Sequence, residues 1–186
     1  MITRDQRKIL IGVLGASHTD HCGLHALDDA KALGREIASR GAVLVTSATS
    51  GIGLWAAMGA LESGGFVIGL SPERDEAEHV ARDLPVEFMS VLLYTGLGDT
   101  ARDLLLSRMT DGVVVGCGGI ESIREVSIAF EESPLVAILD EGETTPDAIL
   151  TYSHGLDRQI QDKIFSKKTI PELVEHLFSR INKKTS

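Results

Sequence analysis

One stretch of the chain, DTARDLLLSRMTDGVVVGCGGIESIREVSIAF, places an arginine, a glycine pair and a glutamate around a single turn. Arg102 lies near the start of an amphipathic run that leads into the apolar strand GVVVG. Gly118 and Gly119 then form a turn before a second helical run that holds Glu125. In a parallel α/β sheet each helix begins near the edge where the preceding strand ends, and ligands bind at that edge. We therefore expect Arg102 and Glu125 to share one ligand-binding rim.

These two residue types can bind and act on an anionic ligand. A carboxylate can stabilise positive charge that develops on a ligand and orient an attacking water. Glu125 could fill this catalytic role. Arg102 could clamp a phosphate or a sugar oxygen through its planar fork of donors, or hold Glu125 ionised. The alternative is a structural ion pair that fastens two helices.

Three loops should meet at the carboxyl edge of the sheet, at residues 15–25, 47–53 and 117–122. Each is rich in Gly, Ser, Thr or Ala, which lets backbone N–H groups approach an anion, and the helix that follows adds a positive dipole end. A nucleotide phosphate is the expected ligand, although turns between strands and helices need small residues in any case. The candidate ligand-binding residues are Gly15, Ser17, Thr46, Ser50, Gly51, Gly118, Gly119 and Ser122.

The rest of the sequence predicts the scaffold for these loops. Apolar runs of strand length alternate with helix-period segments, which predicts an α/β fold, a single-domain Rossmann-like doubly wound parallel sheet of about seven strands with helices on both faces. Most strand runs lack polar alternation, as expected for strands buried on both faces. The predicted strands are Ile9 to Gly15, Ala42 to Thr46, Phe66 to Leu70, Met89 to Tyr94, Gly112 to Gly116, Leu135 to Leu139 and Lys163 to Ser166.

The helical segments carry their own signals. Leu27, Leu33 and Ile37 share one face of a helix that stops at Gly41. Thr169 reads as the N-cap of a closing helix through about Ile181, with a proline and a glutamate in its first turn. A short exposed helix is expected over Asp75 to Asp83, and a loop over Glu141 to Pro146.

Length and charge restrict the class of protein. The 186 residues suffice for one Rossmann-like nucleotide-binding domain over 1–186, with 43% hydrophobic residues and a net charge of −9. The acidic balance argues against a nucleic-acid partner, and no apolar run is long enough to span a membrane. Cys22 and Cys117 are too few for a disulfide framework, which favours a cytoplasmic protein with free thiols. Cys117 could be reactive, but a small buried filler is the more usual role.

Several histidines and acids crowd the first loop, where a transition metal is one alternative. His18, Asp20, His21, Cys22 and His25 offer ligand atoms, but they lack fixed metal-site spacing. Histidine is also a good hydrogen-bonding partner for ribose or base edges. We therefore assign no metal site and no cofactor from the sequence.

The second loop also resembles a different cofactor turn. TSATSGIG is similar to the TGxxxGIG turn of short-chain dehydrogenases. That family places the turn after its first strand and requires a Tyr-x-x-x-Lys pair, whereas Tyr94 and Tyr152 are followed four residues later by Gly98 and Leu156. This reading is set aside.

The order of strands and turns resembles the LONELY GUY family and its lysine decarboxylase-like bacterial relatives over nearly the whole chain. The family's pattern is an Arg, an Asp that ends the helix, a strand and a PGGxGTxxE turn, and Arg102, Asp111 and CGGIESIRE follow in that order. The sequences GASHTD and MGALESGGFVIGLSP agree with other segments of the family. By this resemblance, Arg102 takes the place of the active-site arginine and Glu125 that of the catalytic glutamate.

The resemblance implies two kinds of function. Enzymes of the family are phosphoribohydrolases that release the base and ribose 5-phosphate from nucleoside 5'-monophosphates. Related folds include pure binders, among them a molybdenum cofactor carrier. Glu121 stands where the family has a glycine and would repel a phosphate unless it points outward, which favours the binder, whereas Arg102 and Glu125 favour the hydrolase. The expected partners are a small nucleotide-like ligand and further copies of the chain, as a homodimer or tetramer; the base is not identified.

Overall fold

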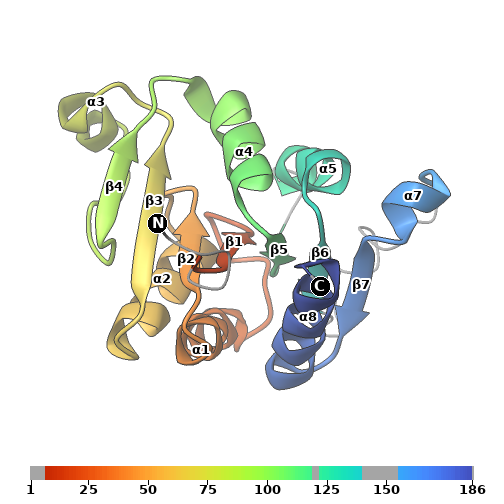
Figure 1. Cartoon of the computed structure of the whole chain (residues 1–186). Helices are drawn as coiled ribbons and strands as arrows, with labels where there is room; N and C mark the ends of the chain where they lie inside the picture. Colours follow the sequence, from red (N-terminus) through yellow and green to blue (C-terminus); the bar gives the residue numbers. More distant parts are fainter. Residues whose placement is uncertain (1–6, 119–121, 140–154, 186) are drawn as a thin grey trace.

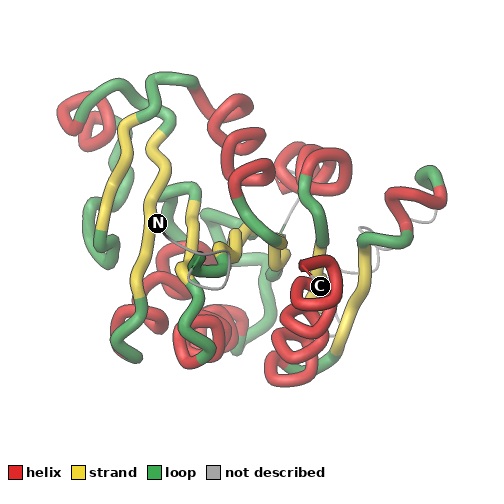
Figure 2. The backbone as a smooth tube through the Cα atoms, viewed as in Figure 1, coloured by secondary structure: helices red, strands yellow, loops and turns green. Residues whose placement is uncertain are grey.

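A computed structural model describes residues 7–118, 122–139 and 155–185, and shows a seven-stranded parallel sheet of order β4-β3-β2-β1-β5-β6-β7 (Figures 1 and 2). This is the doubly wound Rossmann-like fold that the alternation of strands and helices predicts. The strands are β1 Leu10–Leu14, β2 Val43–Thr46, β3 Phe66–Ser71, β4 Val91–Tyr94, β5 Gly112–Val115, β6 Val136–Leu139 and β7 Ile164–Lys167.

Helices cover both faces of the sheet. One face packs against α1 (Ala26–Ser39), α2 (Ile52–Glu62) and α8 (Ile170–Thr185), and the other against α4 (Gly98–Met109) and α5 (Ser122–Glu132). Two short helices, α3 (Glu76–Ala81) and α7 (Arg158–Gln161), complete the described elements. Within the described ranges, no helix is both long and apolar enough to cross a membrane.

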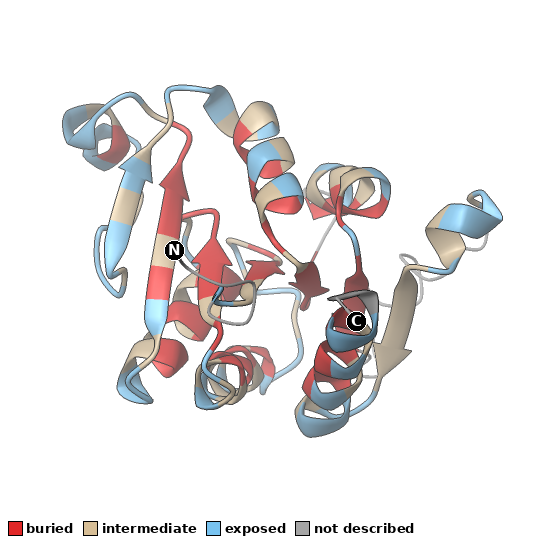
Figure 3. Ribbon diagram, viewed as in Figure 1, coloured by how far each residue is buried: buried red, intermediate tan, exposed pale blue. Residues whose placement is uncertain are grey.

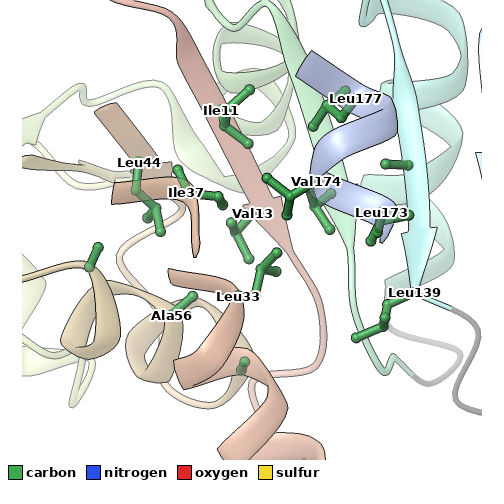
Figure 4. Close-up of a cluster of buried hydrophobic side chains, with 14 of the residues drawn as sticks. Ile11, Val13, Leu33, Ile37, Leu44, Ala56, Leu139, Leu173, Val174 and Leu177 are labelled. Atoms are coloured by element: carbon green, nitrogen blue, oxygen red, sulfur yellow. The ribbon is translucent and has the colours of Figure 1, made fainter. Parts of the chain in front are cut away.

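The larger core lies between the sheet and its first group of helices. Ile11 and Val13 from β1 contribute one side, Leu33 from α1 a second, and Leu173 from α8 a third (Figure 4). The central strands are buried along their length, whereas β4 at the edge alternates between exposed and half-buried residues (Figure 3). The strand runs without polar alternation therefore correspond to the interior of the sheet, as predicted.

The predicted strand positions agree with the structure, with ends that differ by one or two residues. A short helix also forms in the predicted charged segment, and Asp75 caps it by accepting a hydrogen bond from the Glu78 N–H at 2.9 Å. That helix is not wholly exposed, because His79 is buried and its ring bonds to the Ser71 hydroxyl at 2.8 Å. The closing helix begins where Thr169 predicts and runs on to Thr185. The predicted loop over Glu141 to Pro146 lies outside the described residues.

The cysteines differ from the sequence prediction. Cys22 and Cys117 form a disulfide between the loop after β1 and the turn after β5, with their Cα atoms 5.9 Å apart. The expectation of free thiols is therefore wrong for this structure. The two residues lie 95 positions apart, and only the pairing of β1 with β5 brings their loops together. A count of cysteines contains no information on that distance.

Helices α1 and α2 meet at glycines. A Cβ atom added at Gly34 would lie 1.8 Å from the carbonyl oxygen of Ala56, and one added at Gly59 would lie 1.9 Å from that of Lys31. Neither position has room for a side chain, so the two backbones touch directly. This close contact fixes α2, and with it the loop that precedes α2, against the sheet.

Candidate ligand site

The chain reverses its direction of winding between β1 and β5. From β1 the strands proceed outward through β2 and β3 to β4, whereas β5, β6 and β7 continue on the other side (Figure 1). Ligands of open α/β sheets bind outside the carboxyl ends of the strands at such a switch point. The loops after β1, β2 and β5 meet at this place.

A pocket of about 680 Å³ opens at the switch point. Its size lies within the range of small-molecule sites. The loops after β1 and β2, the segment after α3, and the first turns of α4 and α5 all contribute to its wall. The lining residues are Gly15, Ser17, His18, Thr49, Ser50, Arg82, Asp83, Leu84, Asp99, Arg102, Ser122, Arg124 and Glu125.

Arg102 forms the centre of a buried polar network beneath the pocket. Its side chain is only 1% exposed, and it stands one turn into α4. The Nε group donates to Asp103 Oδ1 at 2.8 Å, and Nη1 donates to the backbone oxygen of Ser47 at 2.5 Å. Nη2 lies 3.6 Å from Asp99 Oδ1 and 4.0 Å from Glu125 Oε1. Nε therefore holds Asp103 and Nη1 links α4 to the loop at Ser47, whereas Nη2 faces the acids of the pocket.

Asp103 connects the two helices of this face. Its carboxylate accepts from Arg102 and, through Oδ2, from Arg124 Nη2 at 3.4 Å. The Asp103 side chain is fully buried, and burial raises its pKa while the two arginines oppose that shift. Because Arg102 belongs to α4 and Arg124 to α5, the buried carboxylate sets the relative position of the two helices at the pocket.

Glu125 lies in the first turn of α5 with its carboxyl group on the pocket wall. Its side chain is 14% exposed, and Oε2 is buried with no hydrogen-bond partner among the described residues. Burial, followed by the nearby charge of Asp103, raises the pKa of Glu125 to about 7, against the opposing effects of Arg102 and Arg124. The group therefore changes charge near neutral pH, and it can donate a hydrogen bond below that pH and accept one above it.

The charges that line the pocket nearly balance. Arg82, Arg102 and Arg124 face three acids, Asp83, Asp99 and Glu125. When Glu125 is protonated, the lining carries one net positive charge. Arg82 and Arg124 are also 45% and 52% exposed, so both can reach a ligand.

The structure brings together most of the residues predicted to form the site. Arg102 and Glu125 lie on one rim, as expected, and Gly15, Ser17, Ser50 and Ser122 also line the pocket. Three predicted ligand-binding residues are not among its lining: Thr46, Gly51 and Gly118. Gly119 and Glu121 lie outside the described residues.

Those three residues support the loops instead. Gly51 has a φ of 70°, and a Cβ there would lie 2.1 Å from the carbonyl oxygen of Ala16, so the loops after β1 and β2 cross in direct contact. A Cβ at Gly118 would lie 2.6 Å from the hydroxyl of Ser122. Thr46 is fully buried at the end of β2, and its hydroxyl has no partner among the described residues. Glycine is thus needed at positions 51 and 118 because the neighbouring atoms leave no room for a side chain.

Sequence reasoning missed part of the pocket wall. Arg82, Asp83 and Leu84 follow the short helix α3, and no motif marks them. His18, one of the histidines that the sequence offered as a partner for ribose or a base, also lines the pocket. The remaining lining residues, which were not predicted as ligand contacts, are Thr49, Asp99 and Arg124. One signal was available, because Arg124 directly precedes Glu125 and Asp99 lies three residues before Arg102 on the same helix.

Comparisons with known proteins agree with this fold. The molybdenum cofactor binding protein from the phototrophic bacterium Rippkaea orientalis is 23% identical, with a TM-score of 0.77 over 94% of this chain and 98% of that one. The molybdenum cofactor carrier protein from Chlamydomonas reinhardtii is 25% identical, with a TM-score of 0.73 over 93% and 99% of the two chains. An uncharacterized protein from Archaeoglobus fulgidus is 30% identical over 129 residues, which are 69% of this chain and 78% of that protein.

The family comparison covers the whole sheet and the site. The model of the SLOG cluster4 family matches residues 8–173, from β1 into α8. This match agrees with the resemblance to LONELY GUY-like proteins that the motif around Glu125 indicates. The chain therefore belongs to the SLOG cluster4 family.

Proposed function

We propose that the protein binds a small anionic ligand of the nucleotide or pterin-phosphate type in the switch-point pocket, and that it acts as a carrier of the molybdenum cofactor. The observation that carries the proposal is the pocket wall, which Ser17, Ser50 and Ser122 line together with two partly exposed arginines, Arg82 and Arg124. The similarity to two proteins described as binders or carriers of the molybdenum cofactor supports this choice of ligand.

The pocket residues fit such a ligand chemically. Arg82 and Arg124 offer forked donors to a phosphate, and the serines add neutral donors. Glu125 can hydrogen-bond to the edge of a pterin or a base in either protonation state. Burial keeps Arg102 from moving toward a ligand, so its main contribution to binding is to hold Asp103 and the loop at Ser47 in place.

Glycoside hydrolysis of a nucleoside 5'-monophosphate is a second candidate function. The observation in its favour is the buried Glu125 Oε2, which has no partner among the described residues and can accept a hydrogen bond from a water. A pKa of about 7 also suits a general base at neutral pH. In this reading Glu125 and Arg102 would be the catalytic residues.

One experiment separates the two functions. The purified protein is incubated with molybdenum cofactor released from a molybdoenzyme, and separately with a panel of nucleoside 5'-monophosphates. Bound pterin is quantified by fluorescence after gel filtration, and free base by chromatography. Retained pterin with no base release supports the carrier, whereas base release that disappears in Glu125→Ala supports the hydrolase. If the folded protein neither retains pterin nor releases base, both proposed functions are contradicted.

A matched pair of variants tests the site itself. Arg124→Ala removes a donor from the pocket wall and should weaken retention of the pterin. Arg108→Ala removes an exposed arginine from α4 that pairs with Glu132 at 2.7 Å and does not line the pocket. Equal retention by the two variants would contradict binding in this pocket.

We also propose that copies of the chain self-associate through the edge of the sheet at β3 and β4. Val91 and Leu93 stand beside Ile68 and Leu70 in the parallel register, so they share the face that α4 and α5 cover elsewhere. Phe66, on the same face, is 47% exposed, and Val91 and Leu93 are 39% and 45% exposed. Exposed apolar patches of this kind mark interaction surfaces.

A further inference from the structure

The loop after β1 and the turn after β5 bring three soft ligand atoms together. A ring nitrogen of His21 and the sulfur atoms of Cys22 and Cys117 all lie within 4.8 Å of one another. Cys117 is buried, Cys22 is half-buried and His21 is exposed, so the cluster reaches from the core to the surface. None of the three residues lines the switch-point pocket.

We propose that reduction of the Cys22–Cys117 disulfide creates a binding site for a thiophilic cation such as Zn²⁺, held by His21, Cys22 and Cys117. Two thiolates and an imidazole are the ligand types that Zn²⁺ and similar cations prefer, and three protein ligands leave a fourth position for water or another small ligand. The site does not depend on what the switch-point pocket binds.

The chemistry balances in two steps. A dithiol reductant supplies two electrons and two protons, the bond between the cysteine sulfurs breaks, and the reductant becomes a cyclic disulfide. The divalent cation then binds the two sulfurs and displaces their two protons, and it keeps its oxidation state throughout. The disulfide and the metal site are therefore alternative states of the same two sulfurs.

The surrounding backbone permits the small movement that the cation requires. Tetrahedral Zn–S bonds of about 2.3 Å place two sulfurs roughly 3.8 Å apart, so the sulfurs must separate while staying in the same cluster. Cys117 is fixed, because its carbonyl oxygen accepts from the Ala16 N–H at 2.8 Å. The other side can move, because a Cβ at Gly23 would meet nothing within 4 Å and the Leu24 side chain is 99% exposed.

Either link fixes the same loop. Ser17 and His18 line the pocket, and His21 and Cys22 follow three to five residues later in the chain. A cation that joins Cys22 to Cys117 would therefore hold this loop as the disulfide does. A protein with this site keeps its pocket loop anchored under both oxidising and reducing conditions.

The test uses Co²⁺ as a spectroscopic probe for the site. The folded protein is reduced with a dithiol, and the reductant is removed under anaerobic conditions. Mass spectrometry then verifies the gain of two hydrogen atoms. Addition of Co²⁺ should produce thiolate-to-cobalt charge-transfer absorption that saturates at one equivalent and disappears when Zn²⁺ is added. Oxidised protein should show no such absorption.

Variants assign the ligands. Cys22→Ser should abolish the charge-transfer band or reduce it to that of a single thiolate. His21→Gln should weaken Co²⁺ binding at least about tenfold, the loss already typical of removing an outer-shell partner. His25→Gln is the matched control, an exposed histidine of the same loop outside the cluster, and should bind Co²⁺ as the natural sequence does.

Three results would overturn the proposal. The first is a disulfide that resists the dithiol while the protein stays folded. The second is reduced protein without the charge-transfer band. The third is equal Co²⁺ affinity in His21→Gln and His25→Gln, which would leave the histidine without a role as ligand.

Discussion

At the scale of single residues, the polar network below the pocket has the largest energetic consequences. Arg102 and Asp103 are both almost completely buried, although charged side chains are costly to remove from water. Such a pair is tolerated because its hydrogen bonds are made, and removing one partner leaves an uncompensated charge. The network therefore makes the position of Glu125 depend on Asp103, a buried residue that does not line the pocket.

Arg102→Leu should destabilise the protein by about 3–5 kcal/mol, because Asp103 would keep only the longer contact with Arg124. The free energy of unfolding in urea measures the effect. Arg108→Leu on the same helix is the control, since Arg108 is 61% exposed and surface ion pairs contribute about 0–1 kcal/mol. Similar losses of unfolding free energy in the two variants would show that the buried network stabilises the protein no more than a surface ion pair does.

Glu125→Gln should change how stability depends on pH. The carboxyl group ionises near pH 4.5 in the unfolded chain and near pH 7 in the folded protein, so the folded state binds the proton more tightly. The stabilising effect of this proton is complete below pH 4.5 and is lost as pH rises through 7. The glutamine variant lacks this titration. Its free energy of unfolding, measured relative to that of the natural sequence, should therefore rise by up to about 3 kcal/mol between pH 4 and pH 8.5.

Urea unfolding at several pH values measures this difference. Glu131→Gln, on the exposed side of the same helix, is the control and should keep the pH dependence of the natural sequence. If Glu125→Gln also keeps the pH dependence of the natural sequence, Glu125 has the same pKa in the folded and the unfolded protein.

The sequence could predict part of the site and not the rest. Arg102 and Glu125 were predictable because each stands in the first turns of a helix beside the carboxyl edge, a position that the alternation of elements fixes. Arg82 was not, because its place depends on how the segment after α3 folds back over that edge. The Cys22–Cys117 bond depends on a distance between two loops, which only strand order determines.

At the scale of elements, the contact between α1 and α2 sets the position of the second ligand loop. Gly34 and Gly59 each face a backbone carbonyl of the other helix, so neither helix can shift without a clash. The helix periodicity around Leu33 predicted the buried face of α1, but it did not single out Gly34. Glycine inside a helix costs about 1 kcal/mol relative to alanine, and the close packing explains its presence here.

Gly34→Ala tests this contact. Overpacking against Ala56 costs about 1–3 kcal/mol and the gain in helix propensity is about 1 kcal/mol, so we expect a net loss of stability of up to about 2 kcal/mol. Thermal or urea unfolding measures the change. Gly23→Ala, with open space around its Cβ, should change stability by less than about 0.5 kcal/mol. A more stable Gly34→Ala protein would show that the helices can separate freely.

At the scale of the whole molecule, the sheet has two edge strands that differ in exposure. Strand β7 is half-buried throughout, whereas β4 has exposed apolar residues at alternate positions. The hydrophobic runs predicted that both strands exist. They could not predict which strands lie at the edges, because a run of apolar residues does not identify its neighbours.

Leu93→Lys should disrupt the proposed self-association through β3 and β4. A charge in the centre of an apolar interface must be removed from water without a partner, which is strongly unfavourable. Sedimentation velocity over a range of concentrations should show oligomers for the natural sequence and monomers for the variant. Leu24→Lys changes an exposed leucine on the loop after β1, outside β3 and β4, and should leave the oligomer intact. A natural sequence that sediments as a monomer at all concentrations would contradict the proposed interface.

The central place of β1 also governs how the chain can fold during synthesis. The first strand made pairs with β2 early, but its other edge has to wait for β5, about 100 residues later. Until then, the backbone of Ile11 to Leu14 presents an open edge of the kind that invites pairing with other chains. Such long-range pairings also slow folding. The nascent protein is therefore most exposed to aggregation before residue 115 emerges, and slow translation beyond α4 would prolong that interval.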